Sequence, residues 1–173
     1  VSPDELYSSL TPDTKVVAIM AVNNVTGAIE DTKSLVDCVR RFEKENGKKI
    51  LFFSDSVQAL GKTGLDLKGS DVDGASFSAH KINGPRGVGL LYAKNPEIIR
   101  PIASAGGQES GHRGGTENLP GVAAFDEALT EWMENREEDE ERIGGYNKIL
   151  RETLSKLGLE IISPENASPY ILS

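Results

Sequence analysis

Residues 15–22 read Lys-Val-Val-Ala-Ile-Met-Ala-Val, and this stretch decides the fold. After Lys15 it is continuously apolar, which is typical of a strand covered on both faces, as in a parallel sheet. The run ends in Asn23-Asn24, followed by Thr26-Gly27. Open α/β sheets place their binding sites at the carboxyl ends of such strands, so the residues after Val22 are candidate site residues.

Helices are predicted on either side of this strand. Before it, Ser2-Pro3-Asp4-Glu5 has the cap, the proline and the acids of a helix start. After it, Asp31 or Thr32 can cap a second helix, and Gly47 fits its C-terminal stop. The apolar residues of that second helix lie on one face: Leu35, Val36, Val39 and Phe42.

Three more strands are predicted farther along the chain. Residues 50–53 are a short apolar run, residues 72–77 form a third strand of mostly apolar and small residues, and residues 88–92 form a fourth strand that turns back from the loop before it. The order strand, helix, strand, loop, strand indicates right-handed crossovers. The predicted fold class is therefore α/β, with a mostly parallel sheet and flanking helices.

The second half of the chain changes character. Residues 106–118 are rich in Gly, charged and hydroxyl groups and lack periodicity, as functional loops often do. Two helical stretches follow within 121–158, and Leu159 to Ile162 is predicted to start a new strand. We therefore expect a first domain over 1–120 that lacks its N-terminus, connecting helices over 121–158, and the truncated start of a small second domain over 159–173.

The composition and net charge of the chain argue against several classes of protein and of binding site. The chain has 173 residues, enough for a real core, and a net charge of −8, which argues against a nucleic-acid phosphate surface as partner. No apolar run is long enough to cross a bilayer, and no signal segment is visible. A single cysteine rules out an internal disulfide and fits a reducing, cytoplasmic location. Two histidines and one cysteine, all apart, predict no metal site.

The stretch from Asp73 to Gly89 holds the strongest candidate site. A strand leads into a basic segment and then into a glycine-rich turn. Taken alone, it could be a strand that ends in a solvated basic loop, as most lysines are solvated. The other strand ends favour a site, because they deliver further polar groups to the same edge of the sheet. The candidate residues are Asn24, Asp55, Gln58, Ser78, His80 and Lys81.

Pyridoxal phosphate is a cofactor that would use all of these groups. It needs an amine for its aldehyde, which a partly desolvated Lys81 would supply. It needs a carboxylate at its pyridine nitrogen, which Asp55 would supply, so that the ring can accept electrons. Its phenolic oxygen needs a donor, such as the amide of Gln58 or Asn24. Its phosphate needs hydroxyl and imidazole donors, and the end of the third strand supplies both, in Ser78 and His80.

Several of these residues could instead have a purely structural role. Asn24 at a strand end also makes a good turn residue, and Ser78 could simply cap its strand. Cys38 sits on a predicted helix and is interpreted as a core residue. His112 is interpreted as a loop residue without a ligand.

Four motifs, in this order, resemble those of the cysteine desulfurases, which are class V aminotransferases with the fold-type-I architecture. The resemblance extends over nearly the whole chain. It identifies the domain over 1–120 as the large, pyridoxal-phosphate-binding domain of such an enzyme. The motifs are Asn23-Asn24-x-Thr26-Gly27, Asp55-x-x-Gln58, Ser78-x-His80-Lys81-x-x-Gly84-Pro85-x-Gly87-x-Gly89, and Gly106-Gly107-Gln108-Glu109 with Arg113-x-Gly115-Thr116-Glu117-Asn118.

The resemblance implies a role for each site residue. Lys81 would carry the Schiff base and then act as the base that moves the α-proton, with His80 as a further acid–base group. Thr116 would reach the phosphate of the partner subunit's cofactor, so the active site would be shared across a homodimer. The other cofactor-binding residues would be Asn24, Asp55, Gln58, Ser78 and His80.

The resemblance also implies the reaction, the conversion of L-cysteine to L-alanine. The sulfur would form an enzyme persulfide and pass to an acceptor protein for iron–sulfur cluster assembly or tRNA thiolation. The family's persulfide cysteine and its substrate-binding arginine have no counterpart here, so the 173 residues alone are expected to be inactive. Two alternatives stay open: another class V enzyme, such as a selenocysteine lyase, or an inactive cofactor-domain fragment.

Overall fold

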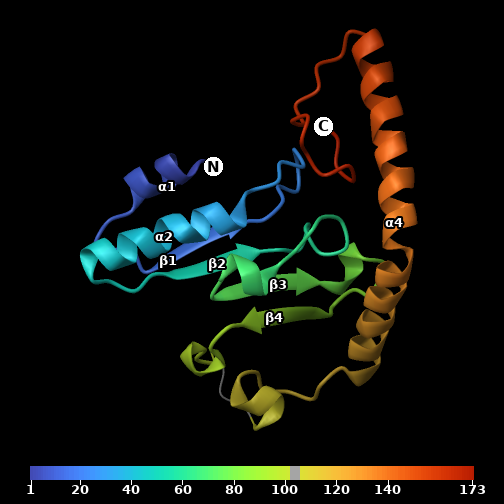
Figure 1. Ribbon diagram of the computed structural model, residues 1–173. Coiled ribbons are helices and arrows are strands. Elements are labelled where there is room, and N and C mark those ends of the chain that lie inside the picture. Colours follow the sequence, from blue (N-terminus) through green and yellow to red (C-terminus); the bar gives the residue numbers. More distant parts are fainter. Residues whose placement is uncertain (102–105) are drawn as a thin grey trace.

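A four-stranded sheet forms the centre of the computed structural model, which describes residues 1–101 and 106–173 (Figure 1). Its strands, in the order in which they pair, are β1 (Val16–Met20), β2 (Leu51–Asp55), β3 (Gly74–Ser78) and β4 (Gly89–Ala93). The first three are parallel and β4 is antiparallel to β3. The predicted α/β fold with a mostly parallel sheet is confirmed, and so is the fourth strand that turns back.

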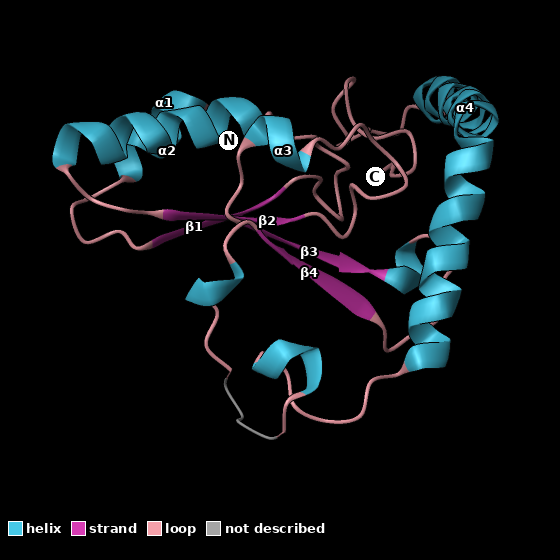
Figure 2. Ribbon diagram, turned by 60° about the horizontal axis from the view of Figure 1, so that its bottom comes forward, coloured by secondary structure: helices cyan, strands magenta, loops and turns pink. Residues whose placement is uncertain are grey.

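Three helices lie on the same side of this sheet (Figure 2). They are α1 (Pro3–Ser9), α2 (Thr32–Asn46) and α3 (Leu67–Ser70). The caps of α2 are those predicted: Asp31 accepts a hydrogen bond from the Ser34 amide, and Gly47 is left-handed, with φ +61°. The α3 helix was not predicted, because four residues are too few to show a period.

The main core lies between α1, α2 and the sheet. It forms where the apolar face of α2 packs on strands whose inward residues are fully covered. The outer face of the sheet is more open, and Val16 on β1 is 55% exposed. The core residues are Leu6, Leu10, Val17, Leu35, Val36, Cys38, Val39, Phe42, Ile50, Phe52 and Val72.

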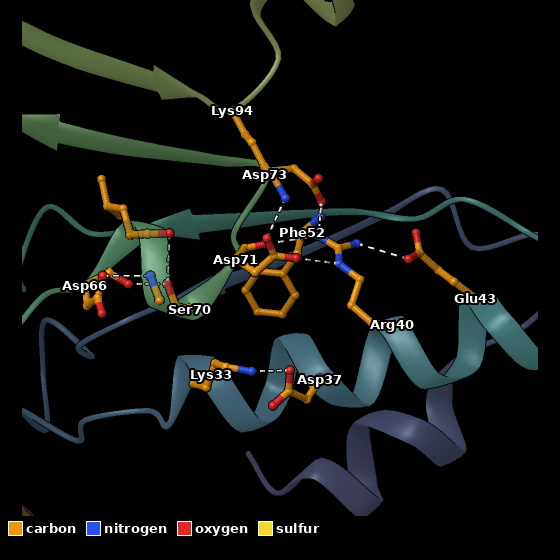
Figure 3. A network of polar contacts seen from close by, with 12 residues as sticks. Lys33, Asp37, Arg40, Glu43, Phe52, Asp66, Ser70, Asp71, Asp73 and Lys94 are labelled. Carbon is orange, nitrogen blue, oxygen red and sulfur yellow. Dashed lines mark hydrogen bonds and ion pairs between the residues drawn. The ribbon is translucent and has the colours of Figure 1, made fainter.

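An arginine ties α2 to the first residues of two strands (Figure 3). Nη2 of Arg40 donates to Oδ2 of Asp73 at 2.7 Å, and Nη1 donates to the carbonyl of Ile50 at 3.0 Å. The same Asp73 oxygen accepts the amide of Phe52 at 2.7 Å, and Glu43 lies 3.3 Å from the guanidinium. Because these charges are mostly covered and fully bonded, they fix where β2 and β3 begin relative to the helix.

A tight connection joins β3 to β4. The last residue of β3, Ser78, faces Gly89, and the amide of Ala79 donates to the carbonyl of Val88 at 3.1 Å. A one-turn 3₁₀ helix, η1 (Ala79–Lys81), follows β3. A Cβ at Gly84 would lie 2.9 Å from the Cβ and carbonyl oxygen of Ala79, so the return of the chain requires a glycine there. The lysine of η1 is thus held between two paired strands.

The long helix α4 (Leu119–Lys156) spans both periodic stretches that predict connecting helices. It has 38 residues and is capped by Asn118, whose Oδ1 accepts the amide of Gly121 at 3.2 Å. The Gly144-Gly145 pair lies inside it without breaking it. Figure 1 shows α4 standing beyond the carboxyl end of β3. Two further short turns, η2 (Pro96–Ile98) and η3 (Gln108–Gly111), precede it.

The segment after α4 is irregular. The predicted strand at residues 159–162 is wrong: Leu159 and Ile162 are exposed and pair with no sheet in the described chain. A short apolar run becomes a strand only beside a partner. Instead, Arg151 on α4 donates to the carbonyls of Ser163 and Pro164, at 3.2 and 2.8 Å.

None of the helices in the described parts of the chain has the length and apolarity needed to cross a membrane.

Candidate active site

Asp55 lies at the carboxyl edge of the sheet, between two neighbouring strands. It is the last residue of β2 and pairs in register with Met20 of β1 and Ser76 of β3. Its side chain is partly buried, and its Oδ1 accepts the amide of Val57 at 3.1 Å. This bond holds the carboxylate at the strand end, where a positively charged ring nitrogen could meet it.

The turn after β2 carries Gln58, which is 8% exposed. The turn is closed by the amides of Ala59 and Leu60, which both donate to the carbonyl of Ser56 at 3.0 Å. The Oε1 of Gln58 accepts a hydrogen bond from Nζ of Lys62 at 2.7 Å. With this oxygen occupied, the amide NH₂ is the group that Gln58 can offer to a ligand.

Lys81 ends η1 and is partly buried. It lines a cavity of about 460 Å³ between the turn that follows β2 and the helix α4. Lys62 and Trp132 line the same cavity, as do acidic residues of α4, among them Glu131. Asn24, Asp55, Gln58, Ser78, His80 and Thr116 are not among its lining residues. Of the predicted site residues, Lys81 is thus the one that lines this cavity.

Lys62 is a site residue that the sequence prediction missed. Its pKa is lowered, first by burial and then by the positive charge of Lys81. The two amines thus lie close enough to repel each other. In the sequence, the sign of this contact is the four-residue spacing between Gln58 and Lys62. This spacing is common in any turn or helix, so it does not identify a site.

Ser78 and His80 form a polar pair. The Oγ of Ser78, at the end of β3, lies 2.8 Å from Nδ1 of His80 in η1. If the hydroxyl donates to Nδ1, the imidazole carries its proton on Nε2 and presents that N–H outward. The His80 ring is exposed, so this imidazole N–H is available to an anion.

Asn24 and Thr116 are the two remaining predicted site residues, and both are exposed. Asn24 is exposed in the loop after β1, and the turn there is built by its neighbour. Oδ1 of Asn23 accepts the amides of Val25 and Thr26, both at 2.9 Å. Thr116 is exposed in the loop between η3 and α4.

These groups fit pyridoxal phosphate by their chemistry. Lys81 offers a partly buried amine, Asp55 a carboxylate whose position is fixed by a backbone amide, and Gln58 an amide donor. The Ser78–His80 pair offers an O–H or N–H donor for a phosphate. The donor set matches a ligand with an aldehyde, a basic ring nitrogen, a phenolic oxygen and a phosphate.

Comparison with protein families finds one matching model, Aminotransferase class-V, over residues 1–170. A NifS/IcsS protein homolog from Lactobacillus delbrueckii subsp. bulgaricus is 39% identical over 99% of this chain and 44% of its own length. A cysteine desulfurase IscS from Clostridium botulinum is 37% identical over 95% of this chain and 39% of its own length. The chain therefore spans less than half the length of these curated relatives.

A solved structure supports the same relationship. A NifS-like protein superposes with a TM-score of 0.89 and 38% sequence identity, over 98% of this chain and 46% of its own. The sheet, its helices and the order of the strand ends are therefore those of a known fold.

Proposed function

Since the chain belongs to the class-V aminotransferase family, we propose that it is the cofactor-binding part of a pyridoxal-phosphate-dependent cysteine desulfurase. The observation that carries the proposal is the partly buried amine of Lys81, held in a cavity beside the carboxyl edge of a family-type sheet. The relatives named as cysteine desulfurases support the choice of reaction within the family.

Five side chains would hold the cofactor within one subunit. Asp55 would bind the protonated pyridine nitrogen, and the amides of Gln58 and Asn24 would donate to the phenolic oxygen. Ser78 and His80 would bind the phosphate. When bound, the cofactor supplies an electron sink for the electrons released at the substrate's α-carbon.

Lys81 would act twice. Its amine would hold the cofactor at the aldehyde group, the place that the amine of L-cysteine takes when the substrate binds. The freed amine would then take the proton from the α-carbon, because it stays within the same cavity. His80 would serve as a second acid–base group near the ring. The amine and acid–base roles described here both belong to side chains of η1, Lys81 and His80.

The sulfur step needs a thiolate that Cys38 does not supply. Its side chain is 5% exposed, its Sγ donates to the carbonyl of Pro3 at 3.1 Å, and burial raises the pKa of the thiol. In our proposal another cysteine of the enzyme takes the sulfur as the C–S bond breaks, leaving L-alanine. The persulfide then goes to an acceptor protein for iron–sulfur cluster assembly or tRNA thiolation. The 173 residues alone would bind cofactor without releasing sulfur.

The proposed enzyme is a cytoplasmic homodimer with a shared active site. Thr116 is exposed and does not line the cavity that contains Lys81, so its hydroxyl is available to a partner subunit. Its hydroxyl would donate to the phosphate of the cofactor bound by the partner.

The test is an absorbance titration of the purified protein with pyridoxal phosphate. We expect an absorbance band at about 410–430 nm, which the Lys81→Ala variant should lack. Lys48→Ala, which removes an exposed lysine at the end of α2, should keep the band. Folded wild-type protein without the band would refute cofactor binding. Cysteine-dependent sulfide release by the whole enzyme that contains these 173 residues, measured next, tests the desulfurase reaction itself.

A further inference from the structure

A glycine brings Lys62 close to the segment that carries Lys81. Gly61 has φ +77°, and a Cβ there would lie 2.4 Å from Cγ2 of Ile82, the residue after Lys81. The turn after β2 therefore packs directly on η1, and a side chain at position 61 would push the two apart. The amides of Lys62 and Thr63 both donate to the carbonyl of Ala59 at 3.0 Å. Lys62 is thus held at a defined place in the wall of the cavity.

The bond from Lys62 decides how the Gln58 amide is oriented. An amide can be turned by 180° with little change of shape, so its surroundings must choose which end is the oxygen. Here Nζ of Lys62 lies 2.7 Å from Oε1, and Gln58 is 8% exposed. The turned amide would place NH₂ against a lysine amine, which has no acceptor when protonated, and would leave two donors unpaired in a covered site.

We propose that Lys62 is a positioning residue, which fixes the Gln58 amide so that its NH₂ group points to the phenolic oxygen of the cofactor. The inference rests on the proposed function for the identity of that ligand. Lys62 itself touches neither the cofactor nor the reacting atoms in this role. It acts by occupying the amide oxygen, so that only a donor remains for the ligand.

The hydrogen bond from Lys62 to Gln58 persists whether or not Lys62 is protonated. Burial and the charge of Lys81 lower the pKa of Lys62. Both the ammonium and the neutral amine of a lysine carry N–H groups, so the bond to Gln58 survives loss of a proton. Lys62 orients the amide as the ammonium, because the neutral amine also carries a lone pair that can accept an N–H from the turned amide.

The first experiment is a double-mutant cycle on the full chain, read by the visible absorbance of bound pyridoxal phosphate. Lys62→Met keeps the length of the side chain and removes the donor, and it should weaken cofactor binding about tenfold and shift the absorbance maximum. Lys62→Arg should restore binding to within about twofold, because it keeps donors at the same place. In a Gln58→Met background, Lys62→Met should cause no further loss. Lys68→Met, at an exposed lysine of α3, is the matched control.

Two results would overturn the inference: an equal loss of affinity in the Gln58→Met background, or no rescue by Lys62→Arg although that variant folds. Thermal unfolding of every variant identifies a loss that comes from misfolding.

A second measurement needs no cofactor. In the ligand-free protein, the Gln58 side-chain NH₂ should give one sharp pair of ¹H–¹⁵N resonances, which Lys62→Met doubles or broadens. An unchanged pair would refute the positioning role even if wild-type protein failed to bind pyridoxal phosphate. That failure would instead refute the proposed function, so the two ideas can fail separately.

Discussion

The Oγ of Ser78 lies 2.8 Å from Nδ1 of His80, across the junction where β3 becomes η1. The contact joins the last residue of a strand to a residue next to Lys81. A change at Ser78 therefore alters the donor state of the imidazole as well as removing one hydroxyl.

Ser78→Ala should weaken pyridoxal-phosphate binding about tenfold or more, because hydrogen bonds to a charged group contribute about 1.5–3 kcal/mol. The absorbance titration measures this. Ser155→Ala, at an exposed position of α4, is the control and should bind as wild type does. Equal affinity in the two variants would exclude Ser78 from the phosphate site.

Arg40→Met should lower the free energy of unfolding by about 3 kcal/mol, because it removes the guanidinium from two largely covered carboxylates, Asp73 and Glu43. Urea denaturation gives the value. The control on the same helix is Lys33→Met, which breaks an exposed pair with Asp37 and should cost at most about 0.5 kcal/mol. Similar losses in both variants would mean that the Arg40 contacts add nothing beyond those of a surface pair.

Gly61→Ala should destabilise the fold by about 1–3 kcal/mol and weaken cofactor binding, because the new methyl group meets Ile82 and the backbone is left-handed. Gly64→Ala is the matched control three residues on, where an added Cβ meets open space. Denaturation and absorbance titration of the two variants test the effect. A Gly61→Ala variant with wild-type stability and cofactor affinity would show that the turn after β2 can move away from η1.

Asp31 should make stability depend on acid pH. Hydrogen bonds from Ser34 lower its pKa in the folded protein. A carboxylate with a lowered folded pKa stabilises the fold above its unfolded pKa of about 3.9, and this contribution is lost as the pH falls through the folded value. Asp31→Asn keeps a capping oxygen but not the charge, so it should cost about 0.5 kcal/mol at neutral pH.

The measurement for Asp31 is urea denaturation between neutral and acid pH. The gap between wild type and Asp31→Asn should close as the pH falls below about 4. Asp13→Asn, in the exposed loop before β1, should give no such closing gap. A gap that stays constant would mean that the charge of Asp31 contributes nothing to the cap.

Much of the fold could be predicted because its signals are local. The run at 15–22 and the capping residues Asp31 and Gly47 mark β1 and the ends of α2 through backbone preferences that need no partner. The run at 159–162 is also mostly apolar, but within the described residues no strand lies beside it, so its sequence alone misled. Pairing is a long-range property, which a short apolar run does not encode.

The site could be predicted only as a set of strand ends. Because parallel strands end at one edge, Asp55 and the residues after β3 were assigned to that edge from their positions in the chain. Lys62 was missed because its importance lies in a single contact with Gln58, which depends on how a turn closes. The cavity beside Lys81 was also missed, because one wall comes from α4, some fifty residues later in the chain.

The long helix α4 has a structural consequence. At about 1.5 Å per residue, its 38 residues follow a helical path of about 57 Å, and Figure 2 shows that its two halves run in different directions. Phe125 and Ala128 near its start pack with Ile82, next to Lys81, while Arg151 near its end binds the C-terminal segment. One continuous helix therefore forms part of the wall of the lysine's cavity and also anchors the last residues of the chain.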